Sequence, residues 1–307
     1  MLLSNARNVV LVEDGVVVKR SADLAGELFF YRELASRVPR LRRLFPRLLP
    51  GSSTARLELE LVPATPLTRV FAGLRMRPRH LSAVFAALGE LHAVGEAEVA
   101  LTTSPAAAKR FLAEKTAARF AAPEFAGLRD APRVLRLLLA RLEAYEPTCV
   151  RVVHGDAWFA NILLEEGSGG DKDAAAIGEA ATAMPPSLQP PEASAPSALR
   201  FVDMRGCIGG ELTLNGDPLY DFAKLLQSLV GFDEAVFDLP TVPPDYRAGL
   251  LTSFFSLVRA RGARPGDVLT ITLCLMAGSI PFHARRERLW HLVCALVESV
   301  CGTTRCH

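Results

Sequence analysis

Lysine is scarce in this sequence of 307 residues, and that scarcity makes each lysine informative. Only five of the 35 basic residues are lysine, at positions 19, 109, 115, 172 and 224. An abundance of Ala and Leu accompanies the bias, which indicates a coding preference rather than a chemical demand. A lysine at the end of a strand or inside a motif therefore stands out against the background.

Several classes of protein are disfavoured by what else is missing. The six cysteines form no Cys-x-x-Cys pair, which argues against a thiolate metal site and a disulfide framework. The formal net charge is only +2, so no overall charge attracts nucleic acid, and six arginines between Arg32 and Arg47 are expected on a solvated helix face. The N-terminus lacks a signal pattern, and the longest apolar run, 268–282, is too short for a membrane and contains Pro281. We therefore expect a soluble cytoplasmic protein.

The first 62 residues carry the patterns of a small β-rich region. Two β-branched runs, 9–12 and 16–19, flank Asp14-Gly15, a pair that favours a tight hairpin turn. Asp23 is placed to cap a helix over 24–36, and residues 57–62 alternate as a strand that Pro63 ends. These patterns predict a hairpin, one helix and a third strand.

From residue 63 onward, helical periodicity dominates. Apolar spacing predicts helices over 81–92, 106–120, 134–144 and 217–230, followed by apolar helices to about residue 300. Short strands are expected at 150–153, 162–164 and 201–202. We therefore predict an α+β fold of two lobes, a small β-rich N-lobe over 1–62 and a large helical C-lobe over 63–307.

Residues 165–199 stand apart from both lobes. The segment is rich in Gly, Ala, Ser and Pro, and it has too little apolar surface to offset its ordering entropy. We predict a disordered insertion. The strands on either side can still pair, because the cost of closing a loop rises only slowly with its length.

A conspicuous polar motif follows the strand predicted at 150–153. It reads His154-Gly155-Asp156, with Asn161 five residues after the aspartate, and Asp203 ends a strand beyond the insertion. A carboxylate on a tight loop can orient an acceptor hydroxyl and take its proton, while an amide oxygen and a second carboxylate can hold Mg²⁺. The set predicts phosphoryl transfer. The plainer alternative is a polar loop in which Asp156 caps backbone amides.

These residues resemble the aminoglycoside phosphotransferase and choline kinase family, which has a protein-kinase-like fold. The likeness extends over nearly the whole chain outside the insertion, and it implies that Asp156 is the catalytic base and that Asn161 and Asp203 bind magnesium. His154 belongs to the same catalytic motif, and we expect it to anchor the loop by a hydrogen bond rather than act as a base. Asp203-Met204-Arg205-Gly206 and the run 216–225 are most similar to a branch associated with capsular polysaccharide synthesis.

Lys19 is the only lysine in the first 108 residues, and it ends a predicted strand. The resemblance implies that it contacts the α- and β-phosphates of ATP and pairs with a glutamate of the following helix. At about 100° per residue, Glu27 lies on the apolar face of that helix and Glu33 lies nearly opposite. A buried carboxylate needs a cation, so Glu27 is the predicted partner. A surface lysine at a strand end is the alternative.

The resemblance also assigns the rest of the nucleotide site. Phosphates are expected over the turn that holds Ser4 and Asn5, and adenine would meet the backbone of Glu60 and Val62 at the hinge between the lobes. Only three residues precede that turn, so we expect the first strand of the family's N-lobe to be missing or very short. Arg205 is expected either to contact phosphate or an anionic acceptor, or to brace the loop through a carboxylate.

Other residues near the motif receive structural roles. We expect Asp217 and Asp221 to cap the helix over 217–230 and to support the catalytic loop. Trp158 and Phe159 are expected to pack beneath the loop, with a place in the acceptor site as the alternative. Lys224 is expected to be structural.

Two functions remain open at this stage. The first is an ATP- and Mg²⁺-dependent phosphotransferase acting on a hydroxyl of a small molecule. A sugar-derived acceptor is favoured by the branch resemblance, with amino alcohols and aminoglycosides still open. The second is a catalytically weak or inactive relative that binds nucleotide as a module, which the short N-terminus favours. A protein kinase is disfavoured, because Asp-Phe-Gly and Ala-Pro-Glu segments are missing.

Overall fold

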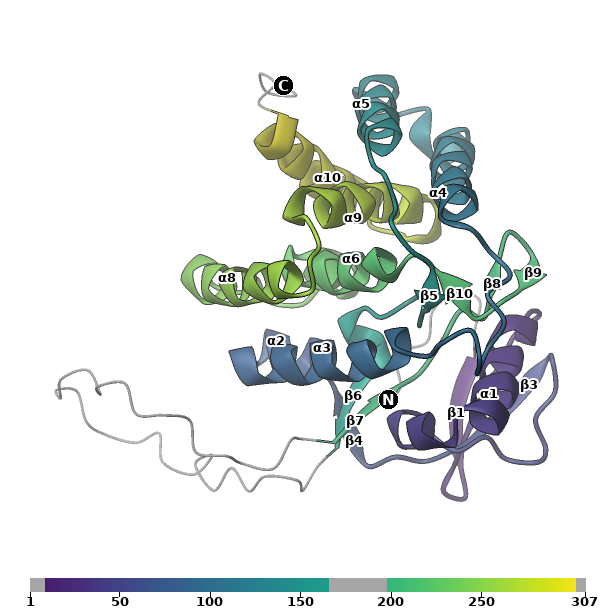
Figure 1. Ribbon diagram of the computed structural model, residues 1–307. Coiled ribbons are helices and arrows are strands. Elements are labelled where there is room, and N and C mark those ends of the chain that lie inside the picture. The colour runs from purple at the N-terminus through teal and green to yellow at the C-terminus, as the bar shows by residue number, and fades with distance from the viewer. Residues whose placement is uncertain (1–8, 166–197, 302–307) are drawn as a thin grey trace, which may run out of the picture.

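The chain folds into a small lobe built on a three-stranded sheet and a large lobe that is mostly helical (Figure 1). The computed structural model describes residues 9–165 and 198–301. The turn with Ser4 and Asn5, and nearly all of the predicted insertion, lie outside the described residues. The predicted α+β fold of two lobes is confirmed.

The N-lobe is an antiparallel sheet accompanied by one long helix. Its elements are β1 (Val9–Glu13), β2 (Val16–Arg20), α1 (Ala25–Arg37), the 3-10 helix η1 (Pro39–Leu44) and β3 (Arg56–Glu60). The strand order is β1-β2-β3, and the predicted hairpin turns at Asp14 and Gly15. Both residues have positive φ, as the tight turns that suit twisted hairpins require.

Helix α1 starts one residue later than predicted. Leu24 occupies the N-cap position and makes no capping bond with its side chain. Asp23, the predicted cap, lies just outside the helix, where its carboxylate accepts a long hydrogen bond of 3.4 Å from the Ala25 amide. Leu24 is buried with Leu28 and Leu57, so an apolar contact fixes the entry of the chain into the helix.

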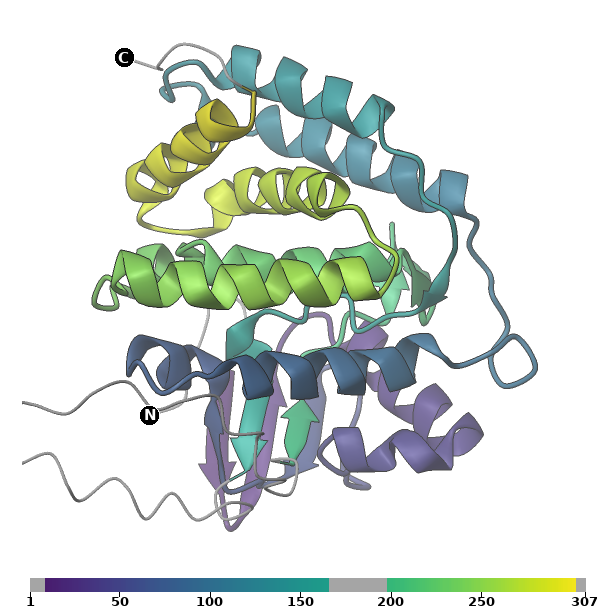
Figure 2. The ribbon, with the colours of Figure 1, turned by 60° about the vertical axis from the view of Figure 1, so that its left-hand side comes forward.

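The C-lobe contains the predicted helices, with bounds that differ by at most three residues. Its helices are α2 (Leu67–Ala72), α3 (Pro78–His92), α4 (Pro105–Phe120), η2 (Pro123–Phe125), α5 (Ala131–Glu143), η3 (Phe159–Asn161), α6 (Pro218–Leu229), α7 (Phe232–Phe237), α8 (Pro244–Ala260), α9 (Pro265–Ser279), η5 (Ile280–Phe282) and α10 (Arg286–Cys301). Figure 2 shows them stacked in layers: α3 nearest the N-lobe sheet, then α6 with α8, then α9 with α10, and α4 with α5 outermost.

Short strands join the catalytic segment to the rest of the C-lobe. They are β4 (Ala64–Pro66), β5 (Arg151–Val152), β6 (Ile162–Glu165), β7 (Leu199–Phe201), β8 (Cys207–Ile208), β9 (Glu211–Leu212) and β10 (Asn215–Gly216). Strands β6 and β7 pair antiparallel with Ile162 opposite Phe201, so the two strands meet across the insertion as predicted. Strands β4, β8, β9 and β10 have only two or three residues each, too few for an alternating pattern to predict.

Helix α9 is the apolar centre of the C-lobe. Within the described residues, Pro265–Phe282 is the one helical stretch long and apolar enough to cross a membrane, with a mean hydropathy of 1.3 over 18 residues. It extends three residues before the apolar run recognised in the sequence. More than half of it, 56%, is buried inside the protein, and α9 packs against α4, α6 and α10 (Figure 2).

Candidate active site

The His154-Gly155-Asp156 motif forms a loop between β5 and β6. Gly155 has φ +78, a conformation that glycine adopts without strain, and it reverses the chain before Asp156. Asp221 of α6 fastens the turn, because its two carboxylate oxygens accept hydrogen bonds from the amides of His154 at 2.9 Å and Gly155 at 2.8 Å. The His92 ring lies 2.9 Å from the same carboxylate. Asp221 therefore supports the catalytic loop, as predicted.

His154 is a buried part of the loop scaffold. Its Nδ1 atom accepts a hydrogen bond of 3.1 Å from the amide of Asp156, and the ring packs edge-on against Phe201. Burial lowers the pKa of His154, although the carboxylates of Asp221 and Asp156 act in the opposite direction. The ring is therefore neutral at physiological pH, and the predicted anchoring hydrogen bond is present.

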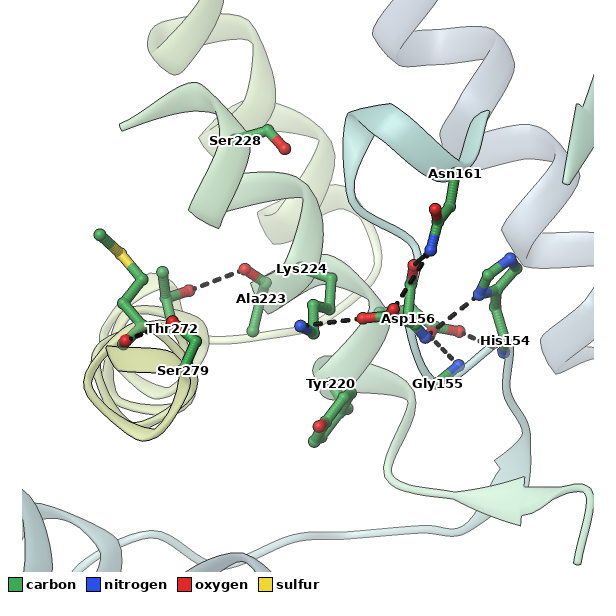
Figure 3. A network of polar contacts seen from close by, with 12 residues as sticks. His154, Gly155, Asp156, Asn161, Tyr220, Ala223, Lys224, Ser228, Thr272 and Ser279 are labelled. Atoms are coloured by element: carbon green, nitrogen blue, oxygen red, sulfur yellow. Dashed lines mark hydrogen bonds and ion pairs between the residues drawn. The ribbon is translucent and has the colours of Figure 1, made fainter. Parts of the chain in front are cut away.

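Asp156 is the partly exposed carboxylate of the loop, with 33% of its side chain accessible. Its Oδ1 atom lies 2.9 Å from Nζ of Lys224, and its Oδ2 atom accepts a hydrogen bond of 3.2 Å from the Asn161 amide (Figure 3). Burial raises the pKa of Asp156, but Lys224 and Arg205 outweigh it, so the net pKa lies below the usual range. The carboxylate is ionised at neutral pH and can accept a hydrogen bond from a hydroxyl.

Asn161 and Asp203 are brought together by the pairing of β6 with β7. The amide of Val202 donates to the carbonyl of Asn161 at 3.0 Å, which places Asp203 next to Asn161. The Asn161 amide nitrogen faces Asp156 (Figure 3), so its oxygen is the atom that could bind a cation. No group of three His, Cys, Asp or Glu side chains suited to a metal occurs in the described part of the chain. Mg²⁺ takes few ligands from protein and the rest from phosphate and water, so two hard oxygen donors fit it.

Lys19 connects the N-lobe to this site. Its Nζ atom lies 2.6 Å from Oε2 of Glu27 and 2.6 Å from Oδ1 of Asp203. The predicted ion pair with Glu27 is present, while Glu33 pairs with Arg37 on the more exposed face of α1 at 2.7 Å. The contact with Asp203 was not predicted, because the two residues are 184 positions apart and only the fold brings them together.

The charges around Lys19 act strongly on one another. Burial and the nearby Asp203 carboxylate raise the pKa of Glu27 to about 7, and Lys19 opposes that shift. Burial lowers the pKa of Lys19, but the two carboxylates outweigh it and the net pKa is raised. Lys19 therefore remains protonated between Glu27 and Asp203. We call these three residues the phosphate clamp, after the contact with nucleotide phosphates that the family resemblance implies for Lys19.

Two glycines allow α1 to approach the Asp203 segment closely. Gly206 has φ +59, and a Cβ atom there would lie 1.8 Å from the carbonyl oxygen of Gly26 in α1. A Cβ on Gly26 would in turn lie 2.3 Å from the carbonyl oxygen of Arg205. Both positions exclude a side chain, so the backbones meet directly and hold Glu27 near Asp203.

The predicted hinge residues follow the last strand of the N-lobe sheet. Glu60 is the last residue of β3 and pairs with Val16 of β2. Within the described residues, no hydrogen bond engages the amide of Val62. Strand β4 begins two residues later and pairs with β6 of the catalytic segment. The segment after β3 therefore connects the N-lobe sheet to a strand paired with β6, which follows the loop that carries Asp156.

The aromatic residues after Asp156 pack beneath the loop, as predicted. Phe159 is fully buried with its ring 5.5 Å from that of Phe71, and Trp158 stacks on Phe237 at 5.4 Å. Beneath them, Ser228 donates to Asp233 at 2.8 Å and accepts the Phe159 amide at 3.0 Å. This buried polar chain was not recognised in the sequence, because no spacing links its members.

Lys224 was predicted to be structural, without a named partner. Its ammonium forms the ion pair with Asp156 and is 12% exposed, a contact that was not predicted. Lys224 lies three residues after Asp221, so both project from the same face of α6 toward the catalytic loop. That spacing, together with the rarity of lysine in the chain, is the signal that could have located it.

Arg205 has no carboxylate within salt-bridge distance among the residues the structure describes, so it does not brace the loop in the way one alternative suggested. Its guanidinium lies over the ring of Tyr220 at 5.0 Å.

Asp217 caps α6 as predicted, and its carboxylate accepts a hydrogen bond of 2.9 Å from the Leu219 amide. It also accepts the Tyr145 hydroxyl proton in a short hydrogen bond.

Solved structures with this fold include kinases of small molecules. The chain is similar to a choline/ethanolamine kinase family protein from Mesorhizobium loti, with 14% identity, a TM-score of 0.58, and coverage of 99% of this chain and 88% of that one. It is similar to a glucosamine kinase in complex with glucosamine, ADP and inorganic phosphate, with 18% identity, a TM-score of 0.53, and coverage of 96% and 79%. A Plasmodium vivax ethanolamine kinase gives 10% identity, a TM-score of 0.52, and coverage of 96% and 82%. At these identities the likeness establishes the kinase-like fold.

Sequence comparison places the chain within a family. The model of the phosphotransferase enzyme family known as APH matches residues 4–172, more than half of the chain. No curated protein matches it. The chain belongs to the phosphotransferase enzyme family, and its fold agrees with that membership.

Proposed function

We propose that this protein transfers the γ-phosphate of ATP, in the presence of Mg²⁺, to a hydroxyl group of a small molecule. The observation that carries the proposal is the phosphate clamp, in which Lys19 from the N-lobe lies 2.6 Å from both Glu27 and Asp203. A lysine held between the two lobes and beside a candidate metal ligand suits the phosphates of a nucleotide. The N-lobe, 1–62, would bind the nucleotide, and the C-lobe, 63–307, would carry the catalytic and acceptor sites.

Each residue of the site has a separate task in this proposal. Asp156 would accept a hydrogen bond from the acceptor hydroxyl and take its proton as the new oxygen–phosphorus bond forms and the bond to ADP breaks. Because the pKa of Asp156 is lowered, it would orient the hydroxyl first and take the proton late in the reaction. Asn161 and Asp203 would hold magnesium, which neutralises phosphate charge when bound.

The remaining assignments concern the nucleotide. Lys19 would contact the α- and β-phosphates while Glu27 keeps its ammonium in place. Ser4 and Asn5 would lie over the phosphates. The Val62 amide, which has no partner in the described structure, and the Glu60 carbonyl would meet adenine. Among acceptors, the resemblance to the branch associated with capsular polysaccharide synthesis favours a sugar-derived molecule.

Thermal unfolding in the presence of nucleotide tests this proposal. ATP with Mg²⁺ should raise the melting temperature, because a ligand at 100 times its dissociation constant stabilises the folded state by about 2.7 kcal/mol. ATP without Mg²⁺ should have a smaller effect, and Asp203→Asn should remove the difference. No stabilisation at millimolar ATP and Mg²⁺ would refute the proposal.

Turnover separates an enzyme from the alternative of an inactive nucleotide-binding module. ATP consumption should be measured across sugars, sugar acids, amino alcohols and aminoglycosides, with Asp156→Asn as the control. An acceptor that raises ATP consumption only in the wild type would support phosphate transfer. Nucleotide binding without turnover over the whole panel would favour the module.

A further inference from the structure

Three cations gather around Tyr220, and one of them contacts Asp156. Lys224 forms the ion pair with Asp156, the Arg205 guanidinium lies over the ring of Tyr220, and Lys115 of α4 donates to the Tyr220 hydroxyl at 3.1 Å. We call Lys115, Arg205, Lys224 and Tyr220 the basic cluster. Its members come from α4, α6 and the segment after Asp203, so only the tertiary structure assembles it.

The basic cluster carries more positive charge than its carboxylates balance. Lys224 is paired with Asp156, but neither Lys115 nor Arg205 has a carboxylate within 4 Å among the described residues. The Asp221 carboxylate contacts the amides of His154 and Gly155 and the ring of His92, so it does not pair with these cations. Unpaired cations in a partly buried site attract an anion, because their electrostatic interactions are stronger there than in water.

Tyr220 reports the positive potential of the cluster. Burial raises the pKa of its hydroxyl, but Arg205, Lys115 and Lys224 outweigh that effect and lower it to about 7. The other three tyrosines of the chain, Tyr31, Tyr145 and Tyr246, all have raised pKa values because they are buried. Tyr220 is therefore the tyrosine whose hydroxyl ionises near neutral pH, and the absorbance of tyrosinate in that range reports on Tyr220.

A pocket adjoins the cluster and the catalytic loop. It is open to solvent, and its walls include Gly155, Arg205, Tyr220 and Phe111. Asp217 is a carboxylate of its lining, and it is occupied by the Tyr145 hydroxyl and the Leu219 amide. Arg205 is thus the cation of the basic cluster in the pocket wall, Lys115 contacts the hydroxyl of the lining residue Tyr220, and the lining holds no free carboxylate among its described residues.

We propose that the acceptor is an anionic hydroxyl compound, such as a sugar acid or a sugar phosphate, and that Lys115 and Arg205 bind its charged group while its hydroxyl faces Asp156. This inference rests on the proposed phosphotransfer and names the substrate class of that same site. Cationic acceptors such as choline or aminoglycosides would require acidic residues at this position, where the structure has lysine and arginine.

Binding can be tested without ATP by the absorbance of tyrosinate. Glucose 6-phosphate, glucuronate, glucose and glucosamine differ mainly in charge, and inorganic phosphate provides the simplest anion. An anion beside Tyr220 disfavours its ionised form, so the two anionic sugars and phosphate should raise its pKa and reduce tyrosinate absorbance at pH 8. Glucose and glucosamine should leave it unchanged, and Tyr220→Phe should abolish the signal.

Substitution of Lys115 tests which ligand the cluster serves. Lys115→Gln should weaken binding of the anionic sugar by about ten-fold, the value expected for a lost contact to a charged group, and leave ATP binding unchanged. Arg110→Gln is the matched control, because Arg110 is an exposed cation of the same helix with 73% of its side chain accessible. Its affinity for the anionic sugar should equal that of the wild type.

Three results would overturn the inference. The first is that no anionic probe, inorganic phosphate included, shifts the Tyr220 titration. The second is that glucosamine or glucose binds more tightly than the anionic sugars. The third is that Lys115→Gln weakens ATP instead of the sugar, which would assign the cluster to nucleotide. If ATP with Mg²⁺ failed to stabilise the protein while the anionic probes still bound, the proposed phosphotransfer would be refuted but the anion site would stand. The two failures are therefore distinguishable.

Discussion

The phosphate clamp and the basic cluster carry opposite charge balances. In the clamp, Lys19 lies between two carboxylates, whereas in the cluster three cations gather around Tyr220 and only Lys224 pairs with a carboxylate, that of Asp156. An excess of carboxylate attracts a divalent cation, through which phosphate then binds. An excess of cation binds an anion directly. The same site can therefore hold two negatively charged molecules by different means.

The largest effect is expected from the carboxylate between the two regions. Asp156→Asn should reduce phosphate transfer by about 10² to 10⁴-fold, because the amide cannot take the proton of the acceptor hydroxyl. Binding of ATP with Mg²⁺, measured by thermal shift, should be retained, since Asp156 is not part of the clamp. Transfer at the wild-type rate would remove Asp156 from its proposed role.

A substitution in the phosphate clamp should instead impair binding of ATP with Mg²⁺. Asp203→Asn removes one proposed magnesium ligand and one neighbour of Lys19, so the Mg²⁺-dependent part of ATP stabilisation should disappear. The response of Tyr220 absorbance to anionic sugars should persist in this variant. If both ligands were lost together, the two regions would not be separate sites.

Within α1, two glutamates provide a matched pair. Glu27→Gln should lower activity at least ten-fold, because Lys19 loses the carboxylate that positions it. Glu33→Gln should change activity less than two-fold, since Glu33 only pairs with exposed Arg37 and such pairs contribute little. Steady-state kinetics of the two variants decide this, and equal losses would contradict the clamp.

The glycine contact between α1 and the Asp203 segment should matter for stability. Gly206→Ala combines positive φ with a Cβ atom 1.8 Å from the Gly26 carbonyl, so we expect a loss of about 3 kcal/mol or more in the free energy of unfolding. Gly210→Ala has φ +92 with open space around the Cβ position, and it should lose only about 1 kcal/mol from backbone strain. Urea denaturation measures both, and similar losses would show that the close approach is unimportant.

The smallest effect concerns pH. The folded-state pKa of Glu27 is about 7, above its ordinary value of 4.5, so the folded protein binds this proton more tightly than the unfolded chain. Its contribution to stability is fully present below pH 4.5 and is lost as the pH rises through about 7. Between pH 5 and pH 8 the wild type should lose about 2 kcal/mol more unfolding free energy than Glu27→Gln. An equal or larger loss in the variant would contradict the raised pKa.

The sequence allowed much of the fold and the catalytic motif to be predicted. Apolar periodicity located α1, α3, α4, α5 and α6 to within three residues, and Asp14-Gly15 located the hairpin, because these signals are local. Helical geometry distinguished Glu27 from Glu33, because a carboxylate on the buried face needs a cation. Capping of α1 by Asp23 was wrong by one residue, since burial of Leu24 outweighed the polar cap. The partner of Lys224 was not predicted, because Asp156 lies 68 positions away on another element.

Motif spacing by itself determined that this chain carries a loop with Asp156 and a neighbouring Asn161. Helical periodicity placed Glu27 on the buried face of its helix, where the family resemblance implied its pairing with Lys19. Those features depend on contacts close in sequence, where residue spacing fixes geometry. Only the tertiary structure decided that Lys19 reaches Asp203, that two glycines press α1 against it, and that Lys115, Arg205 and Lys224 gather around Tyr220. Such contacts join residues on separate elements. The packing of those elements, rather than spacing in the sequence, decides which charged side chains meet.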